Sequence, residues 1–301
     1  MPRLPGRRAA PAARPVRPFA LRPAVRPGGG VRRTRPVRRA SAGLTPVRAG
    51  ALLVALASSA AIYGLASSSA FAVARTTVTG TAWTTRSEIL EAMAVPAGDN
   101  VFTIRTSELE HRLAAIPALR GATVTVALPD EIRAVIDERE AILVWKAGDR
   151  RFLVDRDGLL FAELGADAPA RADALPIVDD GRAQAGALSV GSTLDAVTLD
   201  AALRLGSLTP AEVGTAATAI VLRVDDTNGF TMRTQPPSWT AVFGFYTPTL
   251  RTTDLVPGQV RLLRSLLAGR EDEVARIILA DDHSGTYVPK ATPEPTKQPK
   301  G

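Results

Sequence analysis

The side chains that could carry out chemistry are few and widely spaced. The chain contains no cysteine, which excludes disulfides, thiolate catalysis and cysteine-based metal sites. Its two histidines, His111 and His283, lie far apart in the sequence. His283-Ser284-Gly285 places a base beside a hydroxyl, but adjacent residues cannot supply the oriented geometry of an acyl-transfer triad. We interpret this segment as a polar turn between two strand ends.

Several pairs of aspartates could bind a cation or act as acid and base. Asp155 and Asp157 precede Gly158 as at the start of an EF-hand loop, but no carboxylate follows to complete a calcium cage. We interpret all of these acidic pairs as turns next to apolar runs; the others are Asp179-Asp180, Asp225-Asp226 and Asp281-Asp282. The sequence also lacks the glycine-rich loops that bind phosphates. It therefore predicts no catalytic residue, no cofactor and no metal site, and a protein that is not an enzyme.

Charge divides the chain into two unequal parts. Residues 1–48 hold 13 of the 37 lysines and arginines and no acidic residue, which leaves 24 basic residues against 30 acidic ones in the rest. Nine prolines and almost no apolar periodicity predict that this segment is a disordered tail. Its charge could attract anionic lipids or nucleic acid. The simpler interpretation is a solvated tail that sets membrane orientation, and we expect no nucleic-acid partner.

Residues 49–74 carry no charge and lie between Arg48 and Arg75. As a helix they would be about 39 Å long, against about 30 Å for the hydrocarbon core of a bilayer. Because arginine is concentrated before this stretch, the positive-inside rule places the N-terminus in the cytoplasm and the body outside. A cleaved signal peptide is the alternative, since residues 70–72 and 72–74 resemble cleavage sites. The long basic segment favours an uncleaved anchor and a single-pass, type II membrane protein.

The first part of the body shows a clear order of elements. Thr76–Gly80 is β-prone, and Thr85–Glu88 matches a capping box at the start of a helix. A second helix follows over residues 106–116, with apolar residues on one face. Residues 123–126 and 132–136 then alternate between apolar and polar as two strands would. The order β-α-α-β-β predicts a small α+β unit with both helices on one face of the sheet.

The rest of the body is rich in strand patterns. Two terminal strands are expected at residues 273–279 and 286–288, and a sheet built in this way must end in a strand with unpaired backbone groups. The other expected strands cover 141–145, 151–154, 159–162, 219–224, 230–234 and 240–245, with helices at 194–205 and 259–267. We expect a disordered tail at 1–48, a transmembrane helix at 49–74, an α+β module at 75–141, a β domain at 142–289 and a disordered tail at 290–301.

These residues resemble the FtsQ/DivIB family of bacterial cell division proteins, in which a POTRA module of order β-α-α-β-β precedes an outer β domain. The resemblance rests on many short phrases in the correct order. They are Val78–Gly80, Gly98–Phe102, Leu128-Pro129 and Asp137–Arg139 in the module, and Val154–Phe161 and Leu175–Val178 beyond it. Two departures are Glu140-Ala141, where the family often has a proline, and Ile277–Asp281, where it often has an Ile-Asp-Leu-Arg strand.

The resemblance implies a non-enzymatic scaffold of the divisome, enriched at the septum. It implies that the β domain docks bitopic coiled-coil division proteins of the FtsB and FtsL kind, and that the POTRA module serves recruitment by upstream division factors. Two alternatives remain open. One is an exported POTRA protein that serves outer-membrane assembly or secretion. The other is a secreted binding protein released by signal peptidase.

The sheet edge is the expected binding site. An open edge accepts an extended partner segment as an additional strand, at a net of roughly 0.5–1.5 kcal/mol for each main-chain hydrogen bond. We place this edge at the last long apolar run, with two further residues nearby. The residues are Arg276, Ile277, Ile278, Leu279, Ala280 and Asp281, together with Tyr287 and Val288. The alternative is that Ile277 and Leu279 are core positions of a central strand.

Overall fold

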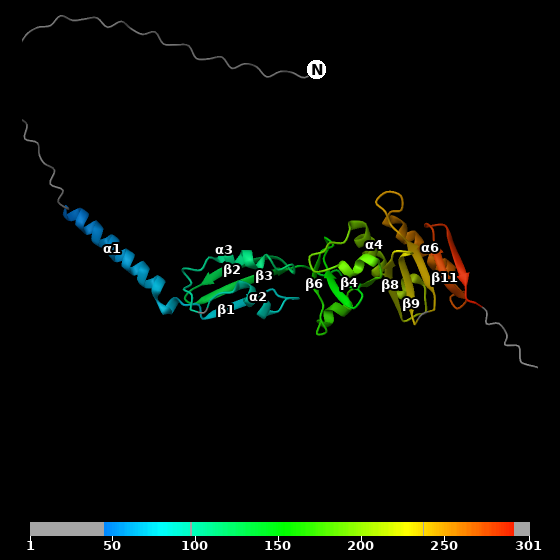
Figure 1. Cartoon of the computed structure of the whole chain (residues 1–301), viewed down its shortest axis with the longest axis horizontal. Helices are drawn as coiled ribbons and strands as arrows, with labels where there is room; N and C mark the ends of the chain where they lie inside the picture. The colour runs from blue at the N-terminus through cyan, green and yellow to red at the C-terminus, as the bar shows by residue number, and fades with distance from the viewer. Residues whose placement is uncertain (1–44, 97, 237, 292–301) are drawn as a thin grey trace, which may run out of the picture. The chain divides into compact units, whose positions relative to one another are not determined.

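The computed structural model describes residues 45–96, 98–236 and 238–291. Within them, one apolar helix is followed by a three-stranded unit with two helices and then by a nine-stranded mixed sheet with helices, which confirms the predicted α+β class (Figure 1). Most of the two predicted disordered tails, residues 1–44 and 292–301, lies outside the described residues. The expected domain boundaries remain predictions.

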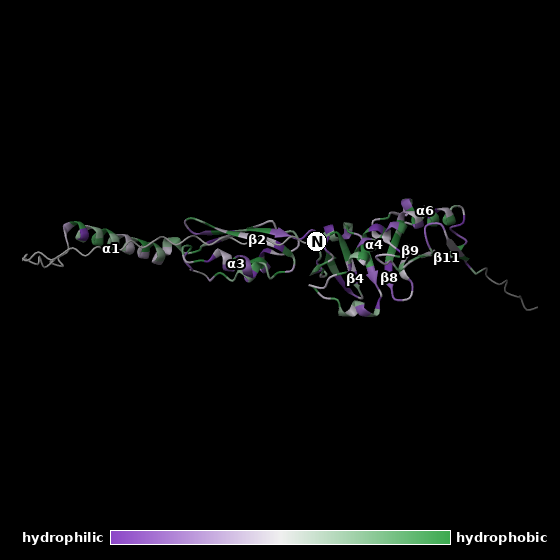
Figure 2. Ribbon diagram, turned by 90° about the horizontal axis from the view of Figure 1, so that it is seen from above, coloured by the Kyte–Doolittle hydropathy of each residue, from purple (hydrophilic) through white to green (hydrophobic). Residues whose placement is uncertain are grey.

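Helix α1 spans Pro46–Ser67 and is the one helix in the described part of the chain that is long and apolar enough to cross a membrane (Figure 2). Its 22 residues give a length of about 33 Å at the usual rise per residue. None of them is buried against other described residues. The last turn closes with a hydrogen bond from the Ser67 hydroxyl to the Tyr63 carbonyl oxygen at 2.8 Å, and a short 3₁₀ turn, η1, follows at Ser69–Phe71.

The three-stranded unit has the predicted order β-α-α-β-β. Its elements are β1 (Arg75–Thr79), α2 (Arg86–Met93), α3 (Thr106–Leu113), β2 (Leu119–Ala127) and β3 (Glu131–Glu138). Strand β3 lies in the middle, parallel to β1 and antiparallel to β2. The predicted capping box is present at Thr85 and Glu88, each side chain accepting the other residue's backbone amide. Apolar side chains of both helices and all three strands pack into one core that includes Ile89, Met93, Leu113 and Ile132.

The nine-stranded sheet runs in the order β12-β11-β10-β9-β8-β7-β4-β5-β6. Its strands are β4 (Leu143–Ala147), β5 (Arg150–Val154), β6 (Leu160–Glu163), β7 (Ile177–Asp180), β8 (Ala219–Asp225), β9 (Gly229–Gln235), β10 (Thr240–Gly244), β11 (Val274–Leu279) and β12 (Gly285–Pro289). The pairs β4/β7, β7/β8 and β10/β11 are parallel, and the other neighbours are antiparallel.

Helices cover one face of this sheet. Helix α4 (Ala196–Gly206) packs on β7 and β8, and α6 (Val256–Leu267) packs on β10, β11 and β12, while the short α5 (Pro210–Val213) contacts α6. Their apolar side chains join those of the strands in one core, because alternate strand residues point to this face. The largest members of that core include Trp145, Phe152, Trp239 and Phe243.

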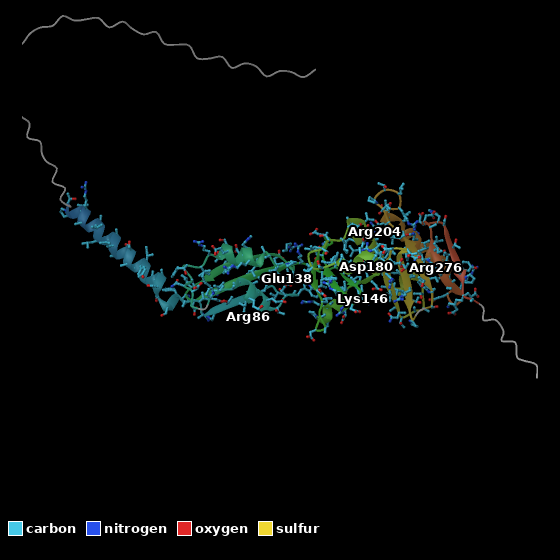
Figure 3. The ribbon with its side chains drawn as sticks, in the orientation of Figure 1. Arg86, Glu138, Lys146, Asp180, Arg204 and Arg276 are labelled. Atoms are coloured by element: carbon cyan, nitrogen blue, oxygen red, sulfur yellow. The ribbon has the colours of Figure 1, made fainter. Side chains whose placement is uncertain are left out.

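Strand β7 was not expected from the sequence, although it pairs with β4 on one side and β8 on the other. It is short and holds two aspartates, a residue type that is depleted in strands. The carboxylate of Asp180 is buried, where it accepts a hydrogen bond from the Trp145 indole at 3.0 Å and pairs with Arg182 at 2.8 Å (Figure 3). These partners compensate for the desolvation of the carboxylate. Arg182 is two residues away in the sequence, but Trp145 is 35 residues away, so no local pattern contains it.

Candidate partner-docking edge

Strand β12 is the outermost strand at one end of the nine-stranded sheet. It pairs with β11 alone, and all five of its residues are exposed. An exposed outer strand leaves one row of backbone donors and acceptors free to pair with another chain. The structure therefore has a candidate docking edge at Gly285–Pro289.

This position corrects the edge that the sequence analysis placed at Arg276–Asp281. Most of that segment belongs to β11, which lies between β10 and β12 and pairs with both. Ile277 and Leu279 are buried core residues, as the alternative interpretation held. The reason is that the short run after Asp281 folds back antiparallel on β11 and covers its outer side. Whether any of the eight predicted residues contacts a partner remains a proposal.

The register shows which backbone groups of β12 face outward. The Ala280 amide donates to the Ser284 carbonyl oxygen at 2.9 Å, so the backbone of Ser284 faces β11. Orientation alternates along an antiparallel strand, and Gly285 and Tyr287 therefore direct their amide and carbonyl groups away from the sheet. Pro289 has no N–H, and the row of outward donors ends there.

Apolar side chains flank the edge on both faces. Tyr287 lies opposite the buried Ile277 and is therefore on the face that α6 covers, where its side chain is 40% exposed. Ile278 and Val288 lie on the other face and are 41% and 46% exposed. Beside Val288 in the register, Arg276 donates to the Asn228 side-chain oxygen at 2.6 Å (Figure 3). An added strand would find apolar contacts above and below its backbone.

Close packing of α6 holds the β11–β12 hairpin in place. A Cβ at Gly258 would lie 2.2 Å from the Cβ of Asp282, and a Cβ at Gly285 would lie 3.1 Å from a methyl carbon of Leu262. Glycine at these two positions allows the helix to approach the hairpin. Helix α6 thus packs closely against the turn and the first residue of the edge strand.

A buried polar cluster fixes the adjacent ends of β10 and β11. The Gln259 side chain is fully buried and donates to the carbonyl oxygens of Phe243 at 3.2 Å and Leu279 at 3.3 Å. The Tyr246 hydroxyl donates to Gln259 at 2.7 Å, and burial raises the pKa of Tyr246 far above its ordinary value. The Arg251 guanidinium also donates to both carbonyl oxygens, at 2.6 and 2.8 Å. The strand beside the open edge is therefore held rigidly.

The turn between β11 and β12 contains the predicted polar segment. The Asp281 carboxylate accepts the backbone amides of His283 at 2.8 Å and Ser284 at 2.5 Å, and these bonds lower the pKa of Asp281. The Asp282 carboxylate lies 2.7 Å from the His283 ring nitrogen. The ligand atoms of these two aspartates and His283 lie within 4.8 Å of one another, but the turn itself accounts for their arrangement. The interpretation as a polar turn is confirmed.

Asp155 and Asp225 also lie in turns, whereas the prediction of a turn at Asp179-Asp180 is wrong, because both residues belong to strand β7. The Asp155 carboxylate accepts the amides of Asp157 and Leu159, each at 2.9 Å, and pairs with Arg139 at 2.6 Å. In the same way, Asp225 accepts two backbone amides of the turn that joins β8 to β9. The carboxylate oxygens of Asp155 and Asp225 thus accept hydrogen bonds from their own turns and stabilise these turns.

The opposite end of the sheet differs from β12. Strand β6 is its last strand there, but residues 191–194 run beside it. The Leu160 amide donates to Ser192 at 2.9 Å, and the Leu160 carbonyl oxygen accepts from Gly191 at 2.8 Å. This segment covers the start of β6, and β12 is the more open of the two edges.

Sequence comparisons relate the chain to known proteins. Residues 71–139 match the family model described as "POTRA domain, FtsQ-type". The chain carries an FtsQ-type POTRA domain. As its sequence predicted, it is related to the FtsQ/DivIB cell division proteins.

Three relatives show the extent of this similarity. The chain is 36% identical over 90 residues to the cell division protein FtsQ of Mycobacteroides abscessus, covering 30% of this chain and 29% of that protein. Identity to FtsQ of Chloroflexus aurantiacus is 30% over 154 residues, or 51% of this chain and 54% of the relative. Cell division protein DivIB of Clostridium acetobutylicum is 24% identical over 72 residues, 24% of this chain and 29% of DivIB. The matches thus span 29% to 54% of the relatives' lengths.

Two glutamates of the POTRA domain bind backbone amides. Glu138, at the end of β3, accepts the amides of Ala82 and Trp83, both at 2.6 Å, and thereby orders the loop before α2 (Figure 3). Glu110 of α3 accepts the amide of Val124 on β2 at 2.8 Å. Because β2 is an outer strand of the POTRA sheet, Glu110 occupies one of its outward donors.

Part of the candidate docking edge was not predicted from the sequence. The prediction named Tyr287 and Val288 as neighbours of the edge. It did not name Gly285 or Pro289, which lie at the two ends of the row of outward-facing backbone groups. The available signal was the pair of aspartates followed by glycine in residues 281–285, which indicates a tight reversal between two apolar runs.

Proposed function

We propose that this chain is a non-enzymatic, single-pass membrane scaffold of the bacterial division machinery. Its N-terminus lies in the cytoplasm, its POTRA and β domains lie outside, and it is enriched at the septum. The β domain binds a bitopic coiled-coil division protein of the FtsB or FtsL kind. The partner contributes an extended segment that adds to the nine-stranded sheet at β12.

The open backbone of β12 is the observation that carries the binding mode. Gly285 and Tyr287 present outward amides and carbonyls, and Tyr287, Ile278 and Val288 supply apolar contacts on the two faces. Main-chain bonds would set the register of the added strand, and the side chains would select its sequence. The relatives, whose names are those of cell division proteins, support the assignment to division.

The membrane assignment is supported by α1. Its length suits a bilayer core of about 30 Å, and its residues, such as Leu53 at 67% exposed, are not buried by the rest of the described chain. Arginine is concentrated on the N-terminal side of the helix, which favours a cytoplasmic N-terminus.

A pair of variants at one position tests strand addition. Tyr287→Pro removes an amide that faces outward, and proline is tolerated at such positions of an edge strand. Tyr287→Ala removes the side chain and keeps the amide. We expect Tyr287→Pro to weaken capture of the FtsB-type protein from the same organism by about 1 kcal/mol more than Tyr287→Ala, about fivefold in Kd.

Thermal unfolding and circular dichroism of both variants serve as the control for folding. If a folded Tyr287→Pro protein binds as tightly as Tyr287→Ala, strand addition at β12 is wrong. A fluorescent fusion separately tests the assignment to division: we expect enrichment at midcell, and a uniform membrane signal would contradict it. Protease added to spheroplasts should digest the body, since the proposed topology places it outside.

A further inference from the structure

Three apolar side chains, two exposed and one partly buried, lie at the end of the POTRA domain that adjoins α1. Phe71 lies in the 3₁₀ turn after α1, Phe102 in the loop between α2 and α3, and Leu128 in the turn between β2 and β3. Phe102 is 51% exposed and Leu128 63% exposed, and Phe71 is partly buried. The two phenylalanine rings lie 5.0 Å apart and are tilted by 55°. We call these three residues the juxtamembrane apolar cluster.

Backbone hydrogen bonds bring the cluster together from distant segments. The Val73 amide donates to the Asp99 carbonyl oxygen at 2.8 Å, and the Ala74 amide donates to that of Asp130 at 3.0 Å. The Phe71 carbonyl oxygen accepts from Val101 at 2.9 Å. The short segment after α1 therefore runs between the loop that carries Phe102 and the turn that carries Leu128.

Asn100 joins this loop directly to the end of α1. Its side-chain amide donates to the carbonyl oxygens of Leu65 and Ser68, each at 3.2 Å, and its side-chain oxygen accepts the Phe102 amide at 3.0 Å. The Leu65 carbonyl belongs to the last turn of α1, whose carbonyls lack α-helical partners, and Asn100 adds a donor to it. These bonds also hold the loop of Phe102 at the level of the last turn of α1.

The position of α1 then sets the depth of the cluster. The helix is about as long as the hydrocarbon core is thick, so Ser67 lies near one boundary of that core. Tyr63, one turn before the helix end and 76% exposed, lies at the same boundary, where amphipathic aromatic rings accumulate in membrane proteins. Phe71 lies only four residues after Ser67 and is therefore close to the same boundary.

We propose that the juxtamembrane apolar cluster inserts into the interface of the bilayer leaflet at which α1 ends. The POTRA domain then rests on the lipid surface. The inference depends on the proposed membrane span. The occupant is lipid because the bonds of Asn100 to Leu65 and Ser68 hold the cluster beside the end of the apolar helix. Two nearby arginines are paired, Arg75 with Asp130 at 3.0 Å and Arg105 with Glu108 at 2.9 Å, which lowers the net charge that approaches the membrane.

The test uses the full chain in phospholipid vesicles and exploits the absence of cysteine. An environment-sensitive dye is attached at Leu128→Cys, which leaves both phenylalanines in place. The control is Val135→Cys, an exposed position on the same domain, four residues beyond Glu131 on β3 and about 13 Å further along the strand. Lipids with a nitroxide near the headgroup end of the acyl chain serve as quencher.

We expect the dye at Leu128→Cys to show blue-shifted, quenched emission, and the dye at Val135→Cys to show neither. Adding Phe102→Ser to the Leu128→Cys protein should reduce the quenching while the protein stays in the membrane after alkaline extraction. Equal, unquenched emission at both sites in a membrane-bound protein would overturn the inference and leave the span intact. A blue shift without quenching would place the dye against protein instead of lipid and would overturn the inference. Release by alkali would overturn the span itself and the inference with it.

Discussion

The side-chain amide of Asn100 donates to the carbonyl oxygen of Leu65 at 3.2 Å, across 35 residues of sequence. One residue lies in the POTRA domain and the other in the last turn of α1. This bond connects the end of the apolar helix to the loop between α2 and α3. We therefore expect the POTRA domain to be coupled closely to the membrane-proximal end of the chain.

Replacing Asn100 with alanine tests that coupling. Asn100→Ala removes the donors to Leu65 and Ser68, and we expect faster proteolysis within residues 68–73 and a loss of about 1 kcal/mol in the free energy of unfolding. Thr103→Ala is the matched control, because its hydroxyl bonds only within the loop, to the Asn100 carbonyl oxygen at 2.8 Å. Equal proteolysis of the two variants would show that Asn100 has no special role.

Adjacent aspartates on β7 should differ strongly in their effect on stability. Asp180→Ala leaves the Arg182 guanidinium, whose side chain is 15% exposed, without its partner, and we expect a loss of about 3 kcal/mol or more in the free energy of unfolding. Asp179 pairs with the more exposed Arg223 at 3.2 Å, so Asp179→Ala should cost about 1 kcal/mol or less. Urea unfolding measures both values, and similar losses would contradict the role of the buried pair.

Two glycines with similar backbone angles separate conformational strain from steric contact. Gly80 has φ +88° and Gly98 has φ +89°, a region that L-residues rarely adopt. A Cβ at Gly80 would lie 2.2 Å from the Ile136 carbonyl oxygen, whereas a Cβ at Gly98 would meet no atom within 4 Å. We expect Gly98→Ala to cost about 1 kcal/mol and Gly80→Ala clearly more. Thermal unfolding of the two variants measures the difference, and equal Tm values would contradict the close contact.

The turn before β12 should respond to acid. The backbone amides of His283 and Ser284 lower the pKa of Asp281, so the folded turn favours the carboxylate. Its stabilising contribution is therefore present above the unfolded pKa, about 3.9, and is lost as pH falls through the lower folded value. Hydrogen exchange at the Thr286 and Val288 amides, which face β11, should rise relative to the intrinsic rate only at the acid end of a titration.

Asp281→Asn provides the control for this acid response. An asparagine oxygen accepts the same amides but does not titrate over this range. We expect the ratio of the observed to the intrinsic exchange rate in the Asp281→Asn hairpin to stay constant through the acid range. An unchanged acid response would locate the titrating group elsewhere.

Local features of the sequence determined much of this protein. The uncharged run after Arg48, the capping box at Thr85–Glu88 and the alternation in residues 123–136 each depend on neighbours within a few residues, and the structure contains the corresponding elements. Their order and short connections predicted the α+β unit that the family comparison identifies as a POTRA domain.

Tertiary structure decided which strand forms the edge and which polar residues are buried. The apolar composition of β11 fits an edge strand and a central strand equally well. Strand β11 is interior only because β12 folds back and pairs with it. Strand β7 accommodates the buried Asp180 because Trp145, 35 residues away, donates to its carboxylate, and the loop of Phe102 meets α1 because Asn100 reaches the Leu65 carbonyl oxygen. Each of these depends on pairing between segments whose contact is set by the packing of the whole domain, which no short pattern encodes.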